Sequence, residues 1–363
     1  MNLLTLSRRL LVLLIGVISC QQTSADEFRD LFNGQDLAGW VRVNTPEDTW
    51  SFEDGMLICT GKPIGEIRTD RMYQNFILEL EWRHLVPKGN AGIFVWADDL
   101  TARGVPFHRG IEVQVLENAY GQSRGYTTHG DIFPIHGATM KPVNGRGGSR
   151  AFPTEERSNA SPEWNHYRIE CRDGNISLAV NGKLVTQGMQ CNPRKGYICI
   201  ESEGGVVHYR NFRIRELPAT PISEDLVAIR DRGFQSLYSG LDLRGWKLPE
   251  GSSSWKSNDW VLTCDHADRG PLLTSEQTIA SGTFLLDVKP SAASESLTLC
   301  GLEMHDFLQS GKWHRVEIRK LNADTEFIVD GTSVAITKRD RQIPLTIRTA
   351  GAADFANLFF SAK

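Results

Sequence analysis

A thirteen-residue segment occurs twice in this chain of 363 residues, and the repeat limits what the chain can fold into. FRDLFNGQDLAGW at Phe28–Trp40 returns as FQSLYSGLDLRGW at Phe234–Trp246, with seven of thirteen positions identical. Two further segments, Trp164–Gly182 and Trp313–Gly331, align without gaps. Such matches predict one type of domain present twice, and the chain length suits about two domains.

The spacing of these matched segments shows how the two copies differ. The offset is 206 residues at the first pair and 149 at the second, so the second copy lacks 57 residues from its middle. In the first copy this middle holds most of the polar and glycine-rich sequence. We therefore expect residues 26–217 to form the working domain. A linker at 218–232 would join it to a degenerate second copy at 233–363.

The N-terminal residues have the pattern of an export signal. Arg8 and Arg9 precede an apolar run that ends near Ile18, too short to span a bilayer as a stable helix. The run closes with VISC, which resembles a bacterial lipobox with Cys20 as the lipidated residue. Ordinary cleavage after Ala25 is the alternative. Either way, residues 1–25 predict an exported protein, periplasmic or lipid-anchored to the outer membrane or cell surface.

Charge and cysteine usage exclude some classes of partner and site. The net charge of −4 and the lack of a basic run argue against a nucleic-acid partner. Six cysteines follow the signal, and the even number allows disulfides, with Cys191 and Cys199 the nearest pair. However, Cys59 and Cys264 occupy equivalent positions in the two copies, which favours small buried hydrophobic residues. No pair has the CxxC spacing of a zinc site.

Short segments with alternating apolar and polar residues recur in both copies. Phe76–Trp82 and Ile176–Val180 show this period, which indicates β-strands. Asp173-Gly174, Asn181-Gly182 and Asp330-Gly331 are typical hairpin turns. No window shows a long helical period with caps. The sequence therefore predicts an all-β fold of two tandem β-sandwich, or jelly-roll, domains, the second of them shortened.

The sharpest candidate for a site is the strand Ile111–Glu117 inside the long region between the first strands. Alternation places its branched residues on one side and Glu112 and Gln114 on the other. Strict alternation would leave Glu117 on the apolar side, which is costly for a carboxylate, and a bulge near Leu116 would return it to the polar side. We therefore expect two carboxylates and an amide across a concave sheet. The alternative is an ordinary polar face whose strand ends at Glu117.

Two resemblances give this strand a chemical meaning. Its spacing is similar to the E-x-D-x-x-E strand of laminarinase-type glycosidases, in which two glutamates about 5–5.5 Å apart serve retaining chemistry; here Gln114 replaces the central aspartate. More broadly, LFNGQDLAGW, WSFEDG, YQNFILELEW with AGIF, GIEVQVLEN, WN and YRNFRI, in this order over Phe28–Leu217, resemble the bacterial 3-keto-disaccharide hydrolase domain family. The second copy matches only at its ends. The resemblance implies concanavalin-A-like sandwiches and cleavage of 3-keto-glycosides.

The chemistry that this resemblance implies needs an acid and a base. A carbonyl at C3 of the sugar acidifies the hydrogen on C2, a base removes it, the C1 leaving group departs by elimination, and water adds back. Glu112 and Glu117 are the candidates for base and acid. His129 and Asp131 would supply a second acid–base group, and Arg68 would meet the enolate oxygen.

Five further residues are candidates for contacts with the substrate. Asn90, Gln114, His136 and Glu203 would donate or accept hydrogen bonds. Trp96 stands where the family often has arginine and would stack on a sugar ring. No cofactor is predicted, although a divalent metal near His129 is compatible with the pattern. The expected partner is an oxidised di- or oligosaccharide.

Ordinary structural roles are the alternative for several of these residues. Arg68 is equally expected to pair with Glu81 or Asp70, and a histidine in a glycine-rich loop is as often a loop residue as a ligand. Glu203 is either a third site carboxylate or a turn residue. At the level of function, a non-catalytic, lectin-like protein and a retaining glycosidase on native glycans are the rivals of the keto-sugar hydrolase. For the second copy we expect a buttress or a sugar-binding role.

Overall fold

The computed structural model describes residues 27–249, 254–265, 270–292, 294–339 and 341–362. The predicted export signal at residues 1–25, with Cys20, lies outside them. The described residues form strands and four short 3-10 turns, and no helix among them is long and apolar enough to cross a membrane. The turns are η1 (Glu47–Thr49), η2 (Asn118–Tyr120), η3 (Glu224–Leu226) and η4 (His305–Phe307).

The first sandwich packs a nine-stranded sheet against a six-stranded sheet, all pairs being antiparallel. The larger sheet has the order β10-β13-β12-β11-β6-β15-β4-β3, with β1 on β15, and the smaller has the order β2-β5-β14-β7-β8-β9. The strands of the larger sheet are β1 (Arg29–Asp30), β3 (Trp50–Glu53), β4 (Met56–Cys59), β6 (Phe76–His84), β10 (Thr139–Pro142), β11 (Asn165–Arg172), β12 (Asn175–Val180), β13 (Lys183–Asn192) and β15 (Val207–Glu216). Those of the smaller sheet are β2 (Trp40–Val43), β5 (Gly65–Thr69), β7 (Gly92–Ala97), β8 (Gly110–Gln114), β9 (Ile132–Ile135) and β14 (Tyr197–Ser202).

The second sandwich packs an eight-stranded sheet against a five-stranded one. Its larger sheet has the order β26-β25-β24-β21-β28-β19-β18, with β16 on β28, and its smaller sheet has the order β17-β20-β27-β22-β23. The strands of the larger sheet are β16 (Gln235–Ser236), β18 (Trp255–Asn258), β19 (Val261–Cys264), β21 (Gly282–Pro290), β24 (His314–Leu321), β25 (Asp324–Val329), β26 (Thr332–Lys338) and β28 (Ala353–Ala362). Those of the smaller sheet are β17 (Trp246–Lys247), β20 (Leu273–Ile279), β22 (Ser296–Leu299), β23 (Leu302–Glu303) and β27 (Ile343–Ala350).

Local sequence explains how these strands are joined. The three predicted turns connect neighbouring strands, and both residues of each have the positive φ that Asn, Asp and Gly tolerate, for example 51° at Asp173 and 77° at Gly174. The alternating apolar residues of each sandwich fill a core between its two sheets. All six described cysteines are buried and free, which confirms that they act as small hydrophobic residues.

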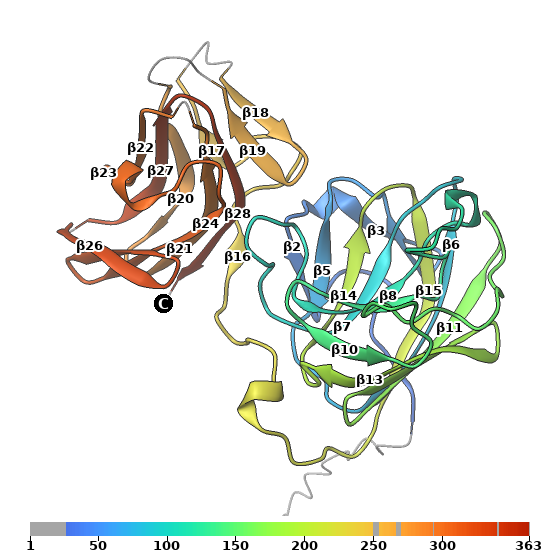
Figure 1. Ribbon diagram of the computed structural model, residues 1–363. Helices are drawn as coiled ribbons and strands as arrows, with labels where there is room; N and C mark the ends of the chain where they lie inside the picture. The colour runs from blue at the N-terminus through green and yellow to red at the C-terminus, as the bar shows by residue number, and fades with distance from the viewer. Residues whose placement is uncertain (1–26, 250–253, 266–269, 293, 340, 363) are drawn as a thin grey trace, which may run out of the picture.

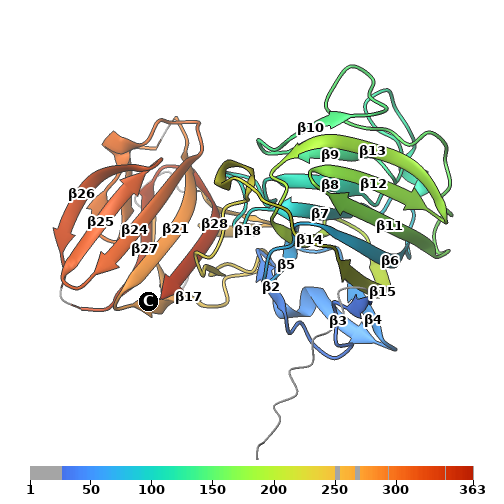
Figure 2. The ribbon, with the colours of Figure 1, turned by 90° about the horizontal axis from the view of Figure 1, so that it is seen from below.

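The two sandwiches lie side by side and share a small core of their own (Figures 1 and 2). The segment between them contains only the 3-10 turn η3 and runs along the first sandwich, where the Ala228 amide bonds to the Lys195 carbonyl. Five apolar residues from the first sandwich, this segment and the second sandwich pack together: Val43, Leu100, Phe234, Leu285 and Phe359. Burial of these side chains between the sandwiches holds them in contact.

Candidate active site

Three buried glutamates lie on the outer face of the six-stranded sheet. Residues directly opposite each other in a ladder point to the same face. Glu66 on β5 pairs with Glu201 on β14, and both alternate with core residues such as Ile67. Glu112 on β8 is on the same outer face, because its neighbour Val113 belongs to the core. Three carboxyl groups from three strands therefore share one surface of the sheet, and all three are buried.

Gly92 on β7 lets two of these carboxyl groups approach each other. Strand β7 lies between β14 and β8. A Cβ atom at Gly92 would lie 2.9 Å from Glu112 Oε1 and 3.0 Å from Glu201 Oε2. The missing side chain leaves a space that both carboxyl groups border. Glu201 Oε2 is buried there without a hydrogen-bond partner.

The carboxyl groups on this face differ in proton affinity. Burial, reinforced by the charge of Glu203, raises the pKa of Glu112 well above its usual value, and burial with the charges of Glu203 and Glu112 does the same for Glu201. Burial raises the pKa of Glu203 to about 7, although hydrogen bonds from Glu201 and Asn90 oppose this effect. Burial thus favours the protonated form of Glu112 and Glu201, beside Glu203, which exchanges its proton near neutral pH. Such a separation of pKa values is what an acid–base pair requires.

Two amides connect this face to Glu203. Gln114 Nε2 donates to Asn90 Oδ1 at 3.1 Å, and Asn90 Nδ2 donates to Glu203 Oε2. Asn90 and Glu203 are half-buried, whereas Glu112 is buried, so a ligand would approach from the Asn90 side. The structure thus brings together four residues that the sequence suggested from separate segments: Asn90, Glu112, Gln114 and Glu203.

Asp131 and Arg150 border the acidic face beside β8. The backbone N–H of Gln114 donates to the Asp131 carbonyl at 2.9 Å, which continues the β8–β9 ladder and puts the Asp131 side chain on the outer face. Arg150 Nη1 donates to Asp131 at 3.0 Å, and its guanidinium lies 3.4 Å from the centroid of the Phe133 ring. The positive charge of Arg150 opposes the rise in the pKa of Glu112. Arg150 thus places a positive charge at the border of the acidic face.

His108 covers the Glu66 end of this face. Its Nδ1 bonds to the Glu66 carboxylate, its backbone N–H donates to Glu66 Oε1 at 3.3 Å, and its Nε2 is buried without a partner. Cys199 Sγ lies 3.8 Å from His108 Nδ1, so the three residues offer donor atoms within 4.8 Å of one another. Burial raises the pKa of the Cys199 thiol well above its usual value. The donor atoms of these three residues contact one another and do not fit an ion well.

The predicted bulge near Leu116 is wrong, and Glu117 does not join Glu112. The β7–β8 ladder continues without an extra residue: Ile93 opposes Val113, and the Glu117 N–H donates to the Gly89 carbonyl at 2.9 Å. The Glu117 side chain therefore points to the same side of the strand as Val113, and the Glu112 side chain points to the other side. The cost of its burial is offset by three backbone donors, the N–H groups of Lys88, Ala119 and Ser161 at 2.8, 2.8 and 3.1 Å. Burial would raise the pKa of Glu117, but these bonds lower it.

The two loop histidines occupy different places. His129 lies against Ser158, whose backbone N–H donates to Nε2 at 3.3 Å and whose hydroxyl contacts Nδ1. Burial lowers the pKa of His129 to about 4, with the charge of Glu117 opposing, so the ring is neutral and neither nitrogen is free for a metal. His136 follows β9 at the exposed edge of the acidic face. Desolvation lowers its pKa, and the charge of Glu66 opposes this.

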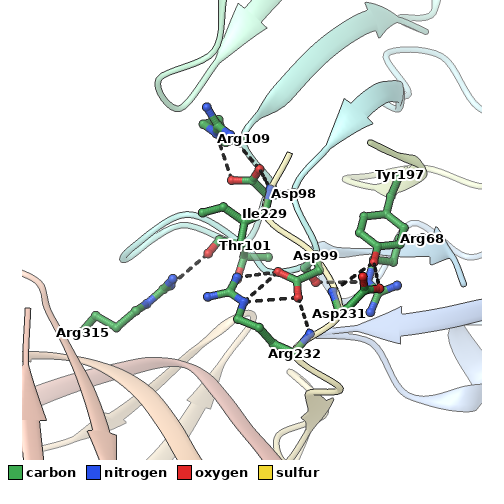
Figure 3. A network of polar contacts seen from close by, with 10 residues as sticks. All are labelled: Arg68, Asp98, Asp99, Thr101, Arg109, Tyr197, Ile229, Asp231, Arg232 and Arg315. Atoms are coloured by element: carbon green, nitrogen blue, oxygen red, sulfur yellow. Dashed lines mark hydrogen bonds and ion pairs between the residues drawn. The ribbon is translucent and has the colours of Figure 1, made fainter. Parts of the chain in front are cut away.

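Arg68 and Trp96 serve the scaffold, in contrast to their predicted contacts with substrate. Arg68 Nε donates to the Asp99 carbonyl at 3.1 Å, and its guanidinium lies 4.4 Å from the centroid of the Tyr197 ring (Figure 3). Glu81, an expected partner, instead accepts from Arg210 and Asn211. Trp96 is fully buried, and its indole donates to the Gln74 carbonyl at 2.8 Å. A register shift between β14 and β7, with φ of 55° at Trp96, turns this side chain from the outer face into the core.

Four residues of this face were missed by the sequence reasoning: Glu66, His108, Arg150 and Glu201. For two of them a signal existed. Glu66 in GEIRT and Glu201 in ICIES each alternate with core isoleucines, so each is a charged residue on the outer face of a strand. For His108 and Arg150, which come from loops, sequence spacing offered no such signal.

Comparison with known proteins agrees with this picture. A family model described as a 3-keto-alpha-glucoside-1,2-lyase-like domain matches residues 27–215. No curated protein matches significantly. Among solved structures, one of a putative glycosyl hydrolase from Parabacteroides distasonis ATCC 8503 is 22% identical, with 53% of this chain and 95% of that chain covered and a TM-score of 0.42.

Two other solved structures resemble the chain more distantly. For carbohydrate binding module CBM66 from Bacillus subtilis the identity is 11%, the coverage 52% of this chain and 100% of that chain, and the TM-score 0.38. For the β-glucanase of Bacillus licheniformis the identity is 13%, the coverage 54% and 100%, and the TM-score 0.35. None of these structural likenesses decides a function.

Proposed function

Because this chain belongs to the 3-keto-alpha-glucoside-1,2-lyase-like domain family and is thus carbohydrate-active, we propose that its first sandwich cleaves the glycosidic bond of 3-keto-glycosides. The observation that carries the proposal is the group of carboxyl groups with separated pKa values on the six-stranded sheet. Elimination next to a carbonyl needs a base for C2 and an acid for the leaving oxygen on C1. We also propose that the protein is exported, from the pattern of its first residues.

Glu203 is the base in this proposal and Glu112 the acid. Glu203 is half-buried, and its pKa of about 7 lets it accept a proton at neutral pH. It removes the C2 proton, and the electron pair of that bond forms the enolate on O3. We assign the guanidinium of Arg150, at the border of the face, to stabilise this enolate. The enolate then expels the C1 oxygen, which takes the proton of Glu112 as the C1–O bond breaks. Water adds to C1, Glu203 exchanges its proton with solvent and returns a proton to C2, and Glu112 takes the proton of the water.

The structure does not form the Glu112–Glu117 pair that a retaining glycosidase was expected to use. That mechanism needs two carboxyl groups about 5–5.5 Å apart on one face. Glu117, the intended partner of Glu112, lies in the opposite phase and accepts three backbone hydrogen bonds.

The proposal is tested by incubating the purified protein with 3-keto-trehalose and with trehalose in D2O. We expect cleavage of the keto-sugar only, with deuterium at C2 of the released 3-keto-glucose above the level of spontaneous exchange. Glu203→Gln should abolish both signals. Glu170→Gln is the matched control, because Glu170 lies on β11 of the opposite sheet and pairs with Arg172. Cleavage without deuterium at C2, or cleavage of trehalose itself, would contradict the proposal.

A further inference from the structure

A hairpin of the first sandwich extends from its acidic face to the second sandwich. Thr101 and His108 form a bridge, and the Ala102 N–H donates to the Phe107 carbonyl at 2.8 Å, so residues 101–108 turn back on themselves. The end of this hairpin is His108, the residue that bonds to Glu66. Whatever fixes the hairpin therefore also fixes His108.

The base of the hairpin is held by the segment between the two sandwiches. Asp98 accepts hydrogen bonds from Arg109 Nε at 2.9 Å and from the Ile229 N–H at 2.8 Å. Asp99 accepts from Arg232 Nε at 3.0 Å (Figure 3). Both aspartates are buried. The Asp99–Arg232 ion pair and the hydrogen bond from the Ile229 N–H to Asp98 connect the base of the hairpin to the chain that leads into the second sandwich.

The tip of the hairpin is held by three side chains of the second sandwich, which we call the Asp287 cluster: Asp287, Arg315 and Asn357. Arg315 Nε and Asn357 Nδ2 donate to the Asp287 carboxylate at 2.8 and 2.7 Å. All three also bond to hairpin backbone. Asp287 accepts from the Gly104 N–H at 2.9 Å, and Arg315 Nη2 donates to the Thr101 carbonyl at 2.9 Å. Asn357 Nδ2 lies 3.0 Å from each of the carbonyls of residues 102 and 105.

Packing supports the same contact. Trp313 of the second sandwich covers the tip so closely that a Cβ at Gly104 would lie 2.4 Å from its ring. Leu100 enters the shared core between the sandwiches. At the other end, the Phe107 ring packs edge-on against Phe94 at 6.0 Å, beside the buried Cys199. The hairpin thus spans from the interface to the acidic face with both ends enclosed.

We propose that the second sandwich is a positioning element for the site: the Asp287 cluster holds hairpin 101–108 and thereby keeps His108 on Glu66 and Phe107 over Cys199. The consequence for turnover rests on the proposed function, whereas the consequence for the hairpin does not. The cluster touches no acidic residue of the first sandwich's sheet. Besides the hairpin it contacts Asn44 of the first sandwich, whose Nδ2 donates to Asn357 Oδ1 at 2.9 Å.

Asn357→Gly in the full chain tests this proposal. Asn357 has φ of 52°, which glycine adopts without strain, so the variant removes the amide while keeping the backbone conformation. Asn211→Gly is the matched control, because Asn211 has the same φ of 52° at the corresponding bulge of β15 but bonds to Glu81 on an exposed surface. Gly104→Ala disturbs the contact from the hairpin side and serves as the second variant.

Two measurements separate this proposal from the proposed function. The first is the rate of maleimide alkylation at Cys199, located by mass spectrometry, with Cys59 and Cys171 as internal references. We expect Asn357→Gly and Gly104→Ala to raise the Cys199 rate about tenfold, since losing hydrogen bonds of this kind favours local opening by that order. The second is kcat on the keto-sugar, which should fall in these variants with KM nearly unchanged.

Each outcome of these measurements either supports or overturns the positioning role of the second sandwich. Faster alkylation at Cys199 alone, with wild-type behaviour in Asn211→Gly, supports positioning even when the wild type has no activity on keto-sugars. If Cys199 is alkylated as slowly in both test variants as in the wild type, the positioning proposal is overturned, whatever the activity. Equal acceleration at Cys59 and Cys171 also overturns it, because that result indicates global unfolding rather than release of the hairpin.

Discussion

The two sandwiches contain the same local feature in different surroundings. In each, an asparagine with φ of 52° sits at a register shift and donates to a carboxylate on the neighbouring strand: Asn211 to Glu81 in the first, Asn357 to Asp287 in the second. The Glu81 side chain is 23% exposed and the Asp287 side chain is fully buried. The same backbone geometry is therefore a surface detail in one sandwich and part of an interface in the other.

On the smaller sheets the buried charged residues lie in the first sandwich instead. The outer face of the first carries Glu66, Glu112 and Glu201, of which Glu112 and Glu201 border Gly92. On the corresponding face of the second, neighbouring strands carry Thr274, Thr298, Thr346 and Arg348, and the sheet ends at the two-residue strand β23. The difference teaches that a sandwich can keep its strand order while its acidic face is lost, because core residues and face residues alternate independently.

Glu112→Gln should have the largest effect and would sharpen this difference between the two faces. We expect cleavage of the keto-sugar to fall about 10²–10⁴-fold, as for removal of a general acid, while deuterium still enters C2 because Glu203 remains. Thr298→Ala, on the outer face of the second sandwich, should leave kcat unchanged. Both rates are measured in D2O by mass spectrometry. Loss of C2 exchange in Glu112→Gln would reverse the assigned roles of acid and base.

Asp287→Ala should have the next largest effect, on stability. It compares the register shift at Asn357 directly with the one at Asn211. Removing this carboxylate leaves the largely buried Arg315 unpaired, which we expect to lower the free energy of unfolding by about 3–5 kcal/mol. Glu81→Ala removes a partner of the exposed Arg210 and should cost less than about 1 kcal/mol. Urea unfolding followed by tryptophan fluorescence measures both. Equal costs would show that burial at the interface does not distinguish the bulges.

The pH dependence of stability should reveal the acidic face of the first sandwich. The folded-state pKa of Glu203 is raised to about 7, so its stabilising contribution is complete below the ordinary value of 4.5 and is lost as pH rises to about 7. His129, lowered to about 4, acts oppositely: its contribution is lost as pH falls below 6.5.

The difference between wild type and Glu203→Gln isolates the first effect. We expect wild type to lose on the order of 2 kcal/mol relative to the variant between pH 4.5 and pH 7, each unit of pKa being worth about 1.4 kcal/mol. Urea titrations at several pH values measure the difference. Parallel stability curves for the two proteins would contradict the shifted pKa.

The smallest effect should come from two glutamates that precede 3-10 turns. Glu117 is buried and caps η2, and Glu303 is exposed and accepts from the His305 N–H at 3.3 Å at the start of η4. We expect Glu117→Ala to cost about 1–2 kcal/mol of stability and Glu303→Ala less than about 0.5 kcal/mol. Thermal unfolding of both variants tests this. A large loss of kcat with unchanged stability in Glu117→Ala would restore Glu117 to the catalytic group.

The sequence predicted the fold well and the site in part, for identifiable reasons. Alternation and turn dipeptides are local, so they indicated the strands, the hairpins and the common face of Glu112 and Gln114. The sequence argument failed at bulges: it placed one near Leu116, where the ladder is regular, and did not place one at Trp96, where the register shifts. A bulge depends on the partner strand, so a single strand's pattern does not locate it.

The sequence by itself determined two similar sandwiches, the shortening of the second, and a first copy with carboxylates on the outer faces of its strands. Only the tertiary structure decided which carboxylates meet, because Glu66, Glu112 and Glu201 are distant in sequence and are joined by the strand order β5-β14-β7-β8. It also decided that Glu117 is a cap and that Asn357 faces a neighbouring sandwich. Local patterns follow from backbone geometry, whereas contacts and pKa values follow from what is packed against each group.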